Sequence, residues 1–118
     1  MSFFRKFFGK QKGVLSTIQK ILQGLREFII ISTLNGLIVY PQNIDDESIH
    51  KLISKARDKL LRITNDIRNN CRILIIDKED KAILGFDYGL LFICLTENFE
   101  HGKRLLCKVM DKIGDVIL

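Results

Sequence analysis

The sequence has little of several things, and each shortage excludes a class of protein. It contains one proline and no tryptophan in 118 residues, while 47% of its residues are hydrophobic, which is not the composition of a disordered chain. Its apolar runs all fall short of the roughly 18 to 20 residues that a membrane-spanning helix needs. No uninterrupted apolar stretch follows the first basic residues, so we predict no secretory signal.

Cysteine is also scarce, and its number is odd. Cys71, Cys94 and Cys107 all lie within apolar patterns. We therefore predict buried, reduced thiols in a cytosolic protein rather than a disulfide framework. A redox role for Cys71 is disfavoured, because neither a histidine nor a predicted helix N-terminus stands near it in sequence to lower the pKa of its thiol.

Motifs that carry chemistry are missing as well. The sequence has no glycine-rich phosphate loop, no Gly-x-Ser-x-Gly, no Cys-x-x-Cys and no His-Glu-x-x-His. Its two histidines, His50 and His101, are isolated in the sequence and are interpreted as surface residues. The acidic run Asp45-Asp46-Glu47 stands where a helix N-terminus favours negative charge. We predict no enzyme activity, no metal site and no cofactor.

What is present is charge of one sign at the start of the chain. Up to Arg26 there are six basic residues and no acidic one, whereas thirteen basic and fourteen acidic residues follow. The body of the protein is therefore at −1 and the whole chain at +5. We interpret residues 1–13 as a basic leader and residues 14–118 as one folded domain. Charge on a short tail suits a membrane surface or a partner groove.

The leader combines apolar and basic side chains, namely Phe3, Phe4, Arg5, Lys6, Phe7 and Phe8. On a helix the four phenylalanines share one face and the two cations turn away from it. Two destinations remain open: the leader folds back onto the domain or a dimer mate, or it docks elsewhere. Gly9 and Gly13 bracket a segment predicted to be a flexible link, which favours docking elsewhere. We expect residues 1–12 to bind an anionic membrane surface reversibly, making the protein cytoplasmic and peripheral to the membrane.

Hydrophobic periodicity predicts the secondary structure. The predicted elements are a helix at 14–26, strands at 28–33 and 37–40, a helix running from about 47 to 67, strands at 71–77, 81–87 and 90–96, and a helix at about 99–117. Asn35-Gly36 between the first two strands predicts a hairpin, since both residues tolerate a positive φ. Two strands are apolar at successive positions, as in Ile29-Ile30-Ile31, so both faces of the sheet must be covered.

The predicted fold is therefore α/β: a three-layer sandwich with a five-stranded, mainly antiparallel sheet in the order α-β-β-α-β-β-β-α. We expect the middle helix on one face of the sheet and the first and last helices on the other. On the middle helix the apolar stripe is expected to comprise Ile49, Leu52, Ile53, Ala56, Leu60, Ile63 and Ile67.

This element order, with the hairpin at residues 29–38, resembles the roadblock / dynein light chain family of the roadblock-longin superfamily. Asn35-Gly36-Leu37-Ile38 is similar to the first hairpin of that family, and the leading helix is less typical of longin domains. Arg26-Glu27 departs from the family, which often has a glycine there, and the phenylalanine-rich leader lies outside its pattern. The resemblance covers residues 14–118. It implies a dimeric scaffold or regulator without chemistry of its own that binds small Ras-like GTPases or motor complexes.

In the sheet order that the resemblance implies, the third strand lies at an edge. An open apolar edge is an aggregation hazard that pairing with a second copy removes. We therefore expect a homodimer, or a heterodimer with a similar roadblock chain, formed through the edge strand with Leu61 of the middle helix as a further contact. The expected interface residues on the strand are Arg72, Ile73, Leu74, Ile75 and Ile76.

A row of cations, Lys51, Lys55, Lys59 and Arg62, follows one flank of the middle helix. It is either a solvated face or a docking strip for the GTPase. Asp58 and Asp66 interrupt the row and no aromatic residue stacks beside it, so we predict no nucleic-acid partner. The alternative function is a small sensory or ligand-binding α/β module with a pocket between the sheet and the middle helix. Such a pocket needs convergent polar groups, and the apolar faces offer none beyond Cys94, which favours the scaffold.

Overall fold

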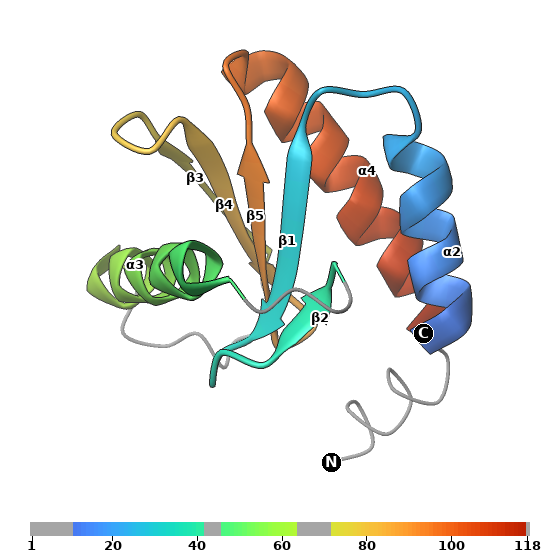
Figure 1. Ribbon diagram of the computed structural model, residues 1–118, viewed down its shortest axis with the longest axis horizontal. Helices are drawn as coiled ribbons and strands as arrows, with labels where there is room; N and C mark the ends of the chain where they lie inside the picture. The colour runs from blue at the N-terminus through green and yellow to red at the C-terminus, as the bar shows by residue number, and fades with distance from the viewer. Residues whose placement is uncertain (1–10, 42–45, 64–71, 118) are drawn as a thin grey trace.

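The structure is a computed structural model that describes residues 11–41, 46–63 and 72–117 (Figure 1). Along the chain it contains α2 (Gln11–Leu22), β1 (Phe28–Thr33), β2 (Ile38–Tyr40), α3 (Glu47–Ile63), β3 (Ile73–Asp77), β4 (Ala82–Asp87), β5 (Leu90–Leu95) and α4 (Phe99–Ile117). This order of helices and strands confirms the predicted one, and the fold is α/β as predicted.

The five strands form one sheet in the order β2-β1-β5-β4-β3. All four neighbouring pairs are antiparallel, so the sheet is antiparallel throughout. The two edges are β2 and β3, and the position of β3 at an edge agrees with the prediction. The edge strands differ in length, because β2 has three residues followed by Pro41 while β3 has five.

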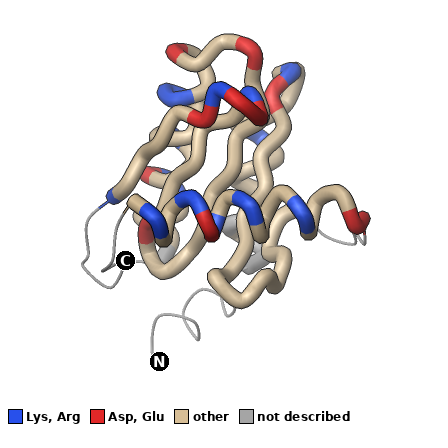
Figure 2. Tube along the Cα trace, turned by 90° about the vertical axis from the view of Figure 1, so that its left-hand side faces the viewer, with Lys and Arg blue, Asp and Glu red and all other residues tan. Residues whose placement is uncertain are grey.

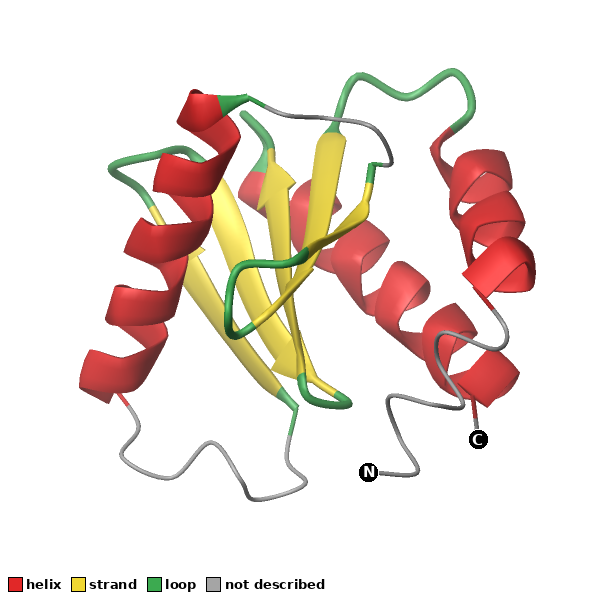
Figure 3. Ribbon diagram, turned by 60° about the horizontal axis from the view of Figure 1, so that its bottom comes forward, coloured by secondary structure: helices red, strands yellow, loops and turns green. Residues whose placement is uncertain are grey.

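Helices cover both faces of the sheet, as the consecutive apolar residues of β1 require (Figures 1 and 3). Ile30 of β1 packs in the core on the α3 side, with Leu60 of α3. Its neighbours Ile29 and Ile31 pack on the opposite side, in the core that includes Leu106 of α4. Helices α2 and α4 lie side by side on that opposite face. The predicted three-layer arrangement is therefore confirmed.

Helix α2 differs from its prediction at both ends. It already includes Gln11 and Lys12, which we had expected in a flexible link before a helix at 14–26, so that prediction is wrong. It ends at Leu22, because Gly24 adopts a left-handed φ of 78° that breaks the helix. Leu15 and Ile18 of α2 are buried, as the periodicity of the helix indicates.

The predicted hairpin between β1 and β2 is present. The N–H of Gly36 donates to the carbonyl of Thr33 at 3.1 Å, and the N–H of Thr33 donates to the carbonyl of Leu37 at 3.0 Å. Gly36 has a φ of 89°, whereas Asn35 is not left-handed. This is a three-residue loop in which only the last position needs glycine.

Helix α3 starts where the acidic run predicts. The Asp46 carboxylate accepts hydrogen bonds from the backbone N–H and the hydroxyl of Ser48, at 2.9 and 2.8 Å, which lowers the pKa of Asp46. Its apolar stripe, however, is shorter than predicted. Ile63 is 65% exposed rather than buried, and Ile67 lies outside the described residues.

The remaining boundaries shift by one or two residues. Strand β3 begins at Ile73 instead of 71, and Cys71 is outside the described residues. Strand β4 begins after Lys81, which sits in the turn with a φ of 52°. Strand β5 ends before Thr96, while α4 has the predicted bounds.

Helix α4 packs closely at Gly102, next to the end of β5. A Cβ atom added at Gly102 would meet the Thr96 side chain, with Cγ2 and Cβ as the nearest atoms. Thr96 is buried, and its hydroxyl both donates to the carbonyl of Asn98 and accepts from the N–H of Asn98. A β-branched side chain held in this way cannot move aside without losing these bonds.

We predict opposite effects for two helical Gly→Ala substitutions. Gly102→Ala should lower the free energy of unfolding by about 1–3 kcal/mol, because it overpacks the contact with Thr96. Gly13→Ala in α2, where nothing lies within 4 Å of an added Cβ, should raise it by about 0.5–1 kcal/mol through helix propensity. Urea unfolding of both variants checks this. Equal effects in the two variants would contradict the close packing at Gly102.

Candidate functional site

The edge of the sheet at β3 exposes apolar surface that a partner strand could cover. Ile76 of β3 is 51% exposed, and Ile63 stands exposed at the end of α3. A hollow of ≈ 410 Å³ lies between them, lined by Lys59, Arg62, Ile63, Ile75, Ile76, Asp77 and Lys78. We call strand β3 together with this hollow the β3 edge. Leu74 packs into the core on the α4 side, and Ile73 and Ile75 pack on the α3 side.

Arg72, directly before β3, connects the start of this strand to the β4–β5 turn and to α4. Its Nε donates to Asp87 Oδ2 at 2.8 Å and its Nη2 to the Tyr88 hydroxyl at 3.3 Å, both at the β4–β5 turn. Its Nη1 lies 2.7 Å from Asp111 Oδ1 on α4. Burial acts to lower the pKa of Arg72, but these bonds outweigh it and raise the pKa. Arg72, predicted to be an interface residue, thus uses its guanidinium within the chain.

The other end of β3 is fastened to α3. Lys59 Nζ donates to Asp77 Oδ2 at 2.6 Å and to Asp80 Oδ2 at 3.3 Å. Lys55 Nζ lies 3.4 Å from Asp80 Oδ1. Two of the four cations of the predicted docking strip therefore make ion pairs with the end of β3 and the turn that follows it.

Asp77 and Lys59 form the least exposed of these pairs, with side chains 7% and 25% exposed. Burial acts to raise the pKa of Asp77, but the hydrogen bonds from Lys59 and from the backbone N–H groups of Asp80 and Glu79 outweigh it. The pKa of Asp77 therefore lies below its usual value. The bond to Asp77 also raises the pKa of Lys59. Both groups are charged at neutral pH.

The other two cations of the strip, Lys51 and Arg62, are exposed on α3. Neither forms an ion pair with another residue in the described ranges. Figure 2 shows α3 across the front of the molecule with several basic positions along it. A partner could therefore reach Lys51 and Arg62 without breaking a bond within the described part of the chain.

Leu61 is exposed, but the structure does not bring it together with β3. Arg57 Nη1 donates to the carbonyl of Leu34 at 3.3 Å, so this flank of α3 faces the β1–β2 hairpin. Leu61 follows Arg57 by one turn and lies on the same flank, whereas Lys59 marks the flank toward β3. Ile63, which we had placed in the buried stripe, is the exposed apolar residue that adjoins β3.

The cysteines, histidines and acidic residues that could catalyse a reaction or bind a metal do not form such a site in the described residues. Burial raises the pKa of the Cys94 thiol to about 12, which disfavours the thiolate. Cys107 is half-buried rather than buried as predicted. His101 is not isolated, because its Nδ1 lies 2.5 Å from Glu27 Oε1. Within residues 11–41, 46–63 and 72–117 no three His, Cys, Asp or Glu residues form a group that could hold a metal ion.

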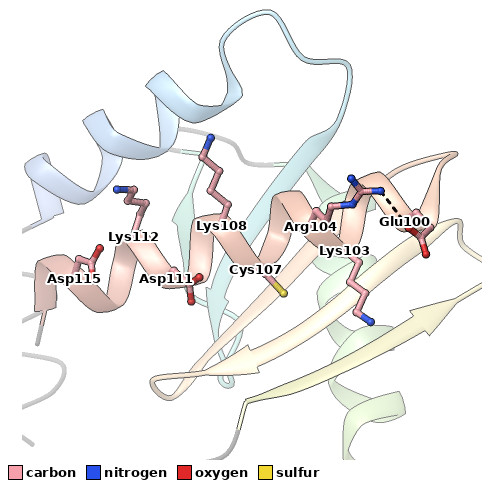
Figure 4. A pocket seen from close by; sticks show the side chains of 8 residues that line it. All are labelled: Glu100, Lys103, Arg104, Cys107, Lys108, Asp111, Lys112 and Asp115. Carbon is pink, nitrogen blue, oxygen red and sulfur yellow. Dashed lines mark hydrogen bonds and ion pairs between the residues drawn. The ribbon is translucent and has the colours of Figure 1, made fainter.

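Two other hollows are open to solvent. One of ≈ 590 Å³ is lined only by residues of α4, which are Glu100, Lys103, Arg104, Cys107, Lys108, Asp111, Lys112 and Asp115 (Figure 4). Another, of ≈ 610 Å³, lies at the end of the sheet beside Lys81 and Thr96. Neither lies between the sheet and α3, where apolar side chains including Ile53, Leu60 and Leu91 fill the core. These hollows are not the pocket that a ligand-binding module would need.

Sequence reasoning missed the acidic partners of the strip, although one signal was present. Alternation along β3 places Asp77 on the same face as Ile73 and Ile75, facing α3. A carboxylate on a buried face needs a cation, and Lys59 supplies it. Asp87 and Asp111, which pair with Arg72 rather than with the strip, carry no such local signal. The leader residues Phe3, Phe4, Arg5, Lys6, Phe7 and Phe8 lie outside the described residues.

Comparison of the chain with protein-family models, with curated proteins and with solved structures found no match. Among the helices of the described ranges, none is long and apolar enough to cross a membrane.

We predict that Asp77→Ala lowers the free energy of unfolding by about 1–3 kcal/mol at neutral pH, because it leaves Lys59 without its closest partner. The pKa of Asp77 is depressed in the folded state, so its contribution is present above the unfolded value of about 3.9 and is lost as the pH falls through the folded value. The difference from the wild type should therefore shrink below about pH 4.

Urea unfolding at a series of pH values measures this difference. The matched control is Asp58→Ala, which removes an exposed carboxylate of α3 that makes no ion pair with the rest of the described chain. We expect it to change stability by less than about 0.5 kcal/mol. A difference for Asp77→Ala that stays constant down to acidic pH would mean that its cause is not the charge of Asp77.

Proposed function

We propose that this protein is a non-enzymatic, dimeric scaffold or regulator that binds a small Ras-like GTPase and is tethered to membrane by its N-terminal leader. The observation that carries this proposal is the β3 edge. In the described sheet β3 pairs with β4 on one side only; it exposes apolar surface at Ile76 and is held at both ends by ion pairs of Arg72 and Lys59. A strand held in place for pairing loses little further conformational freedom when it pairs.

The two edges of the sheet differ in a way that favours β3 as the interface. Strand β2 is short, and Pro41 directly after it cannot donate a ladder hydrogen bond. Strand β3 has neither proline nor glycine, and its neighbour Ile63 adds exposed apolar surface. A second copy related by a two-fold axis would pair β3 with β3 and cover both.

The partner class rests on the resemblance to the roadblock / dynein light chain family. The element order on which that resemblance depends is the one observed, α-β-β-α-β-β-β-α in the described residues. Lys51 and Arg62 support the choice of α3 as the docking helix, because they are exposed cations whose charge the described residues do not neutralise. They would attract an acidic protein surface.

The chemical groups described above support a non-enzymatic role. The Cys94 thiol is held protonated by burial, and in the described part of the chain none of the three hollows brings a histidine together with a cysteine. A binding protein needs no such convergence, whereas general acid–base or nucleophilic catalysis does. Nucleotide turnover by this protein without any GTPase would overturn the proposal.

We predict that Ile76→Lys converts the dimer to a monomer. The substitution places two like charges near each other across the β3–β3 interface, which should weaken the dimer at least about 100-fold. Light scattering at micromolar concentrations measures the mass. Leu37→Lys beside the other edge is the matched control, because Leu37 is 58% exposed and lies away from β3; this variant should stay dimeric. A wild-type protein that is monomeric by light scattering would contradict the proposed dimer.

We predict that Lys51→Glu with Arg62→Glu lowers the association rate of the GTPase about tenfold and reduces its dependence on salt. The measurement is binding kinetics with a panel of purified Ras-like GTPases, each loaded with GDP or with a non-hydrolysable GTP analogue. Lys108→Glu with Lys112→Glu makes the same change of charge on α4 and should leave the rate unaltered. Equal losses in both double variants would place the docking surface elsewhere, and no binding by any GTPase would overturn the partner class.

A further inference from the structure

The arrangement of the layers gives the dimer two different sides. We propose that the α2–α4 layer is the side that faces an anionic membrane, while the α3 layer faces the GTPase on the other side of the sheet. This inference rests on the proposed dimer and its leader, and it adds an orientation to them. It follows from where α2, α3 and β3 lie in the described structure, and from the basic charge of the α2–α4 layer.

The first step is the symmetry of the β3–β3 pair. Two antiparallel copies of one strand in a continuous sheet are related by a two-fold axis perpendicular to the sheet. Such an axis rotates a copy within the plane and does not turn it over. Because α3 and the α2–α4 pair cover opposite faces, both α3 helices lie on one side of the dimer. Both α2–α4 pairs lie on the other side.

The leader is attached to the α2–α4 side of the protein. Residues 1–10 run directly into α2, which begins at Gln11. The two leaders of a dimer are therefore both joined to the side that carries α2 and α4. One flat membrane can then receive both leaders at once, without either chain having to pass around the edge of the sheet.

The α2–α4 side of the dimer carries exposed basic and polar residues. From Gln11 to Arg26 the chain contains no acidic residue, and Ser16, Gln19, Lys20 and Gln23 are exposed. On α4, Figure 4 shows Lys108 and Lys112 projecting away from the strands. The acids of α4 are partly neutralised, since Glu100 pairs with Arg104 and Asp111 with Arg72.

The layer as a whole is basic. Its charged residues from Gln11 to Arg26 and along α4 are Lys12, Lys20, Arg26, Lys103, Arg104, Lys108 and Lys112 against Glu100, Asp111 and Asp115. Basic residues near an anionic bilayer each contribute favourably, and lysines on flexible stems do not need a shaped partner. A lipid surface therefore fits this layer better than a folded acidic protein.

Two leaders on one dimer should raise its affinity for a membrane. A short apolar and basic segment binds a membrane weakly by itself. When both leaders face one bilayer, the second binds at a high effective concentration after the first. The dimer should therefore bind vesicles far more tightly than a monomer with an intact leader. Dimerisation at β3 would then control attachment at the membrane.

The absence of tryptophan from the chain allows a direct test of the orientation. Ser16→Trp places a single tryptophan on α2, and Ser54→Trp places one on α3; both serines are exposed. Each full-length variant is mixed with phosphatidylcholine–phosphatidylserine vesicles that carry brominated acyl chains, which quench tryptophan on contact. We expect at least about twofold quenching for Ser16→Trp, because that residue should lie at the headgroup boundary. We expect none for Ser54→Trp.

The second arm measures avidity by co-sedimentation with the same vesicles. Ile76→Lys should lower the vesicle affinity about 100-fold although its leader is intact, and Leu37→Lys should not. Equal binding by a monomeric Ile76→Lys variant would overturn the bivalent attachment. Quenching of Ser54→Trp, or of neither variant while the protein sediments, would overturn the orientation alone. A wild type that does not sediment would overturn the leader as a tether as well, and the dimer and the GTPase would still be judged by light scattering and binding kinetics.

Discussion

Burial of three consecutive isoleucines in β1 is the constraint on which the rest of the structure depends. Ile29, Ile30 and Ile31 are fully buried, and successive side chains of a strand point to opposite faces. A single helical layer could cover only one of those faces. The chain therefore needs α3 on one side and α2 with α4 on the other. Once both faces are covered, the sheet can contact other proteins chiefly through its edges, and β3 is the longer edge.

The charges around β3 hold the strand in position in addition to contributing to stability. The Lys59–Asp77 pair is poorly exposed, so its desolvation offsets part of its Coulomb attraction. The Arg72 guanidinium forms ion pairs with Asp87 next to the β4–β5 turn and with Asp111 on α4. Both ion-pair groups hold the ends of a strand that has a neighbour on one side only in the described sheet. An edge strand held in this way is ready to pair and loses little entropy in doing so.

Much of the fold could be predicted from the sequence because it depends on local periodicity. The spacing of three to four residues between the apolar side chains of α4 and the apolar runs of β1 and β5 give their element types directly. The turn at Gly36 could not be distinguished from a two-residue hairpin, because Asn-Gly suits both. Ile63 continues the stripe of α3 in sequence, yet it is exposed because it lies beside an open edge. The pairing of Arg72 with Asp111 depends on the tertiary packing of distant elements, which periodicity does not contain.

Two cations of α3 form no ion pair within the described residues, and their separation restricts what kind of partner can bind both. Lys51 and Arg62 stand about 16 Å apart along the helix axis, at 1.5 Å per residue. Lys55 and Lys59, which lie between them, are already held by Asp80 and Asp77. A small anion or one acidic side chain cannot reach both ends of such a span. A partner that neutralises both must present acidic groups over an extended surface, which a folded protein does and a metabolite does not.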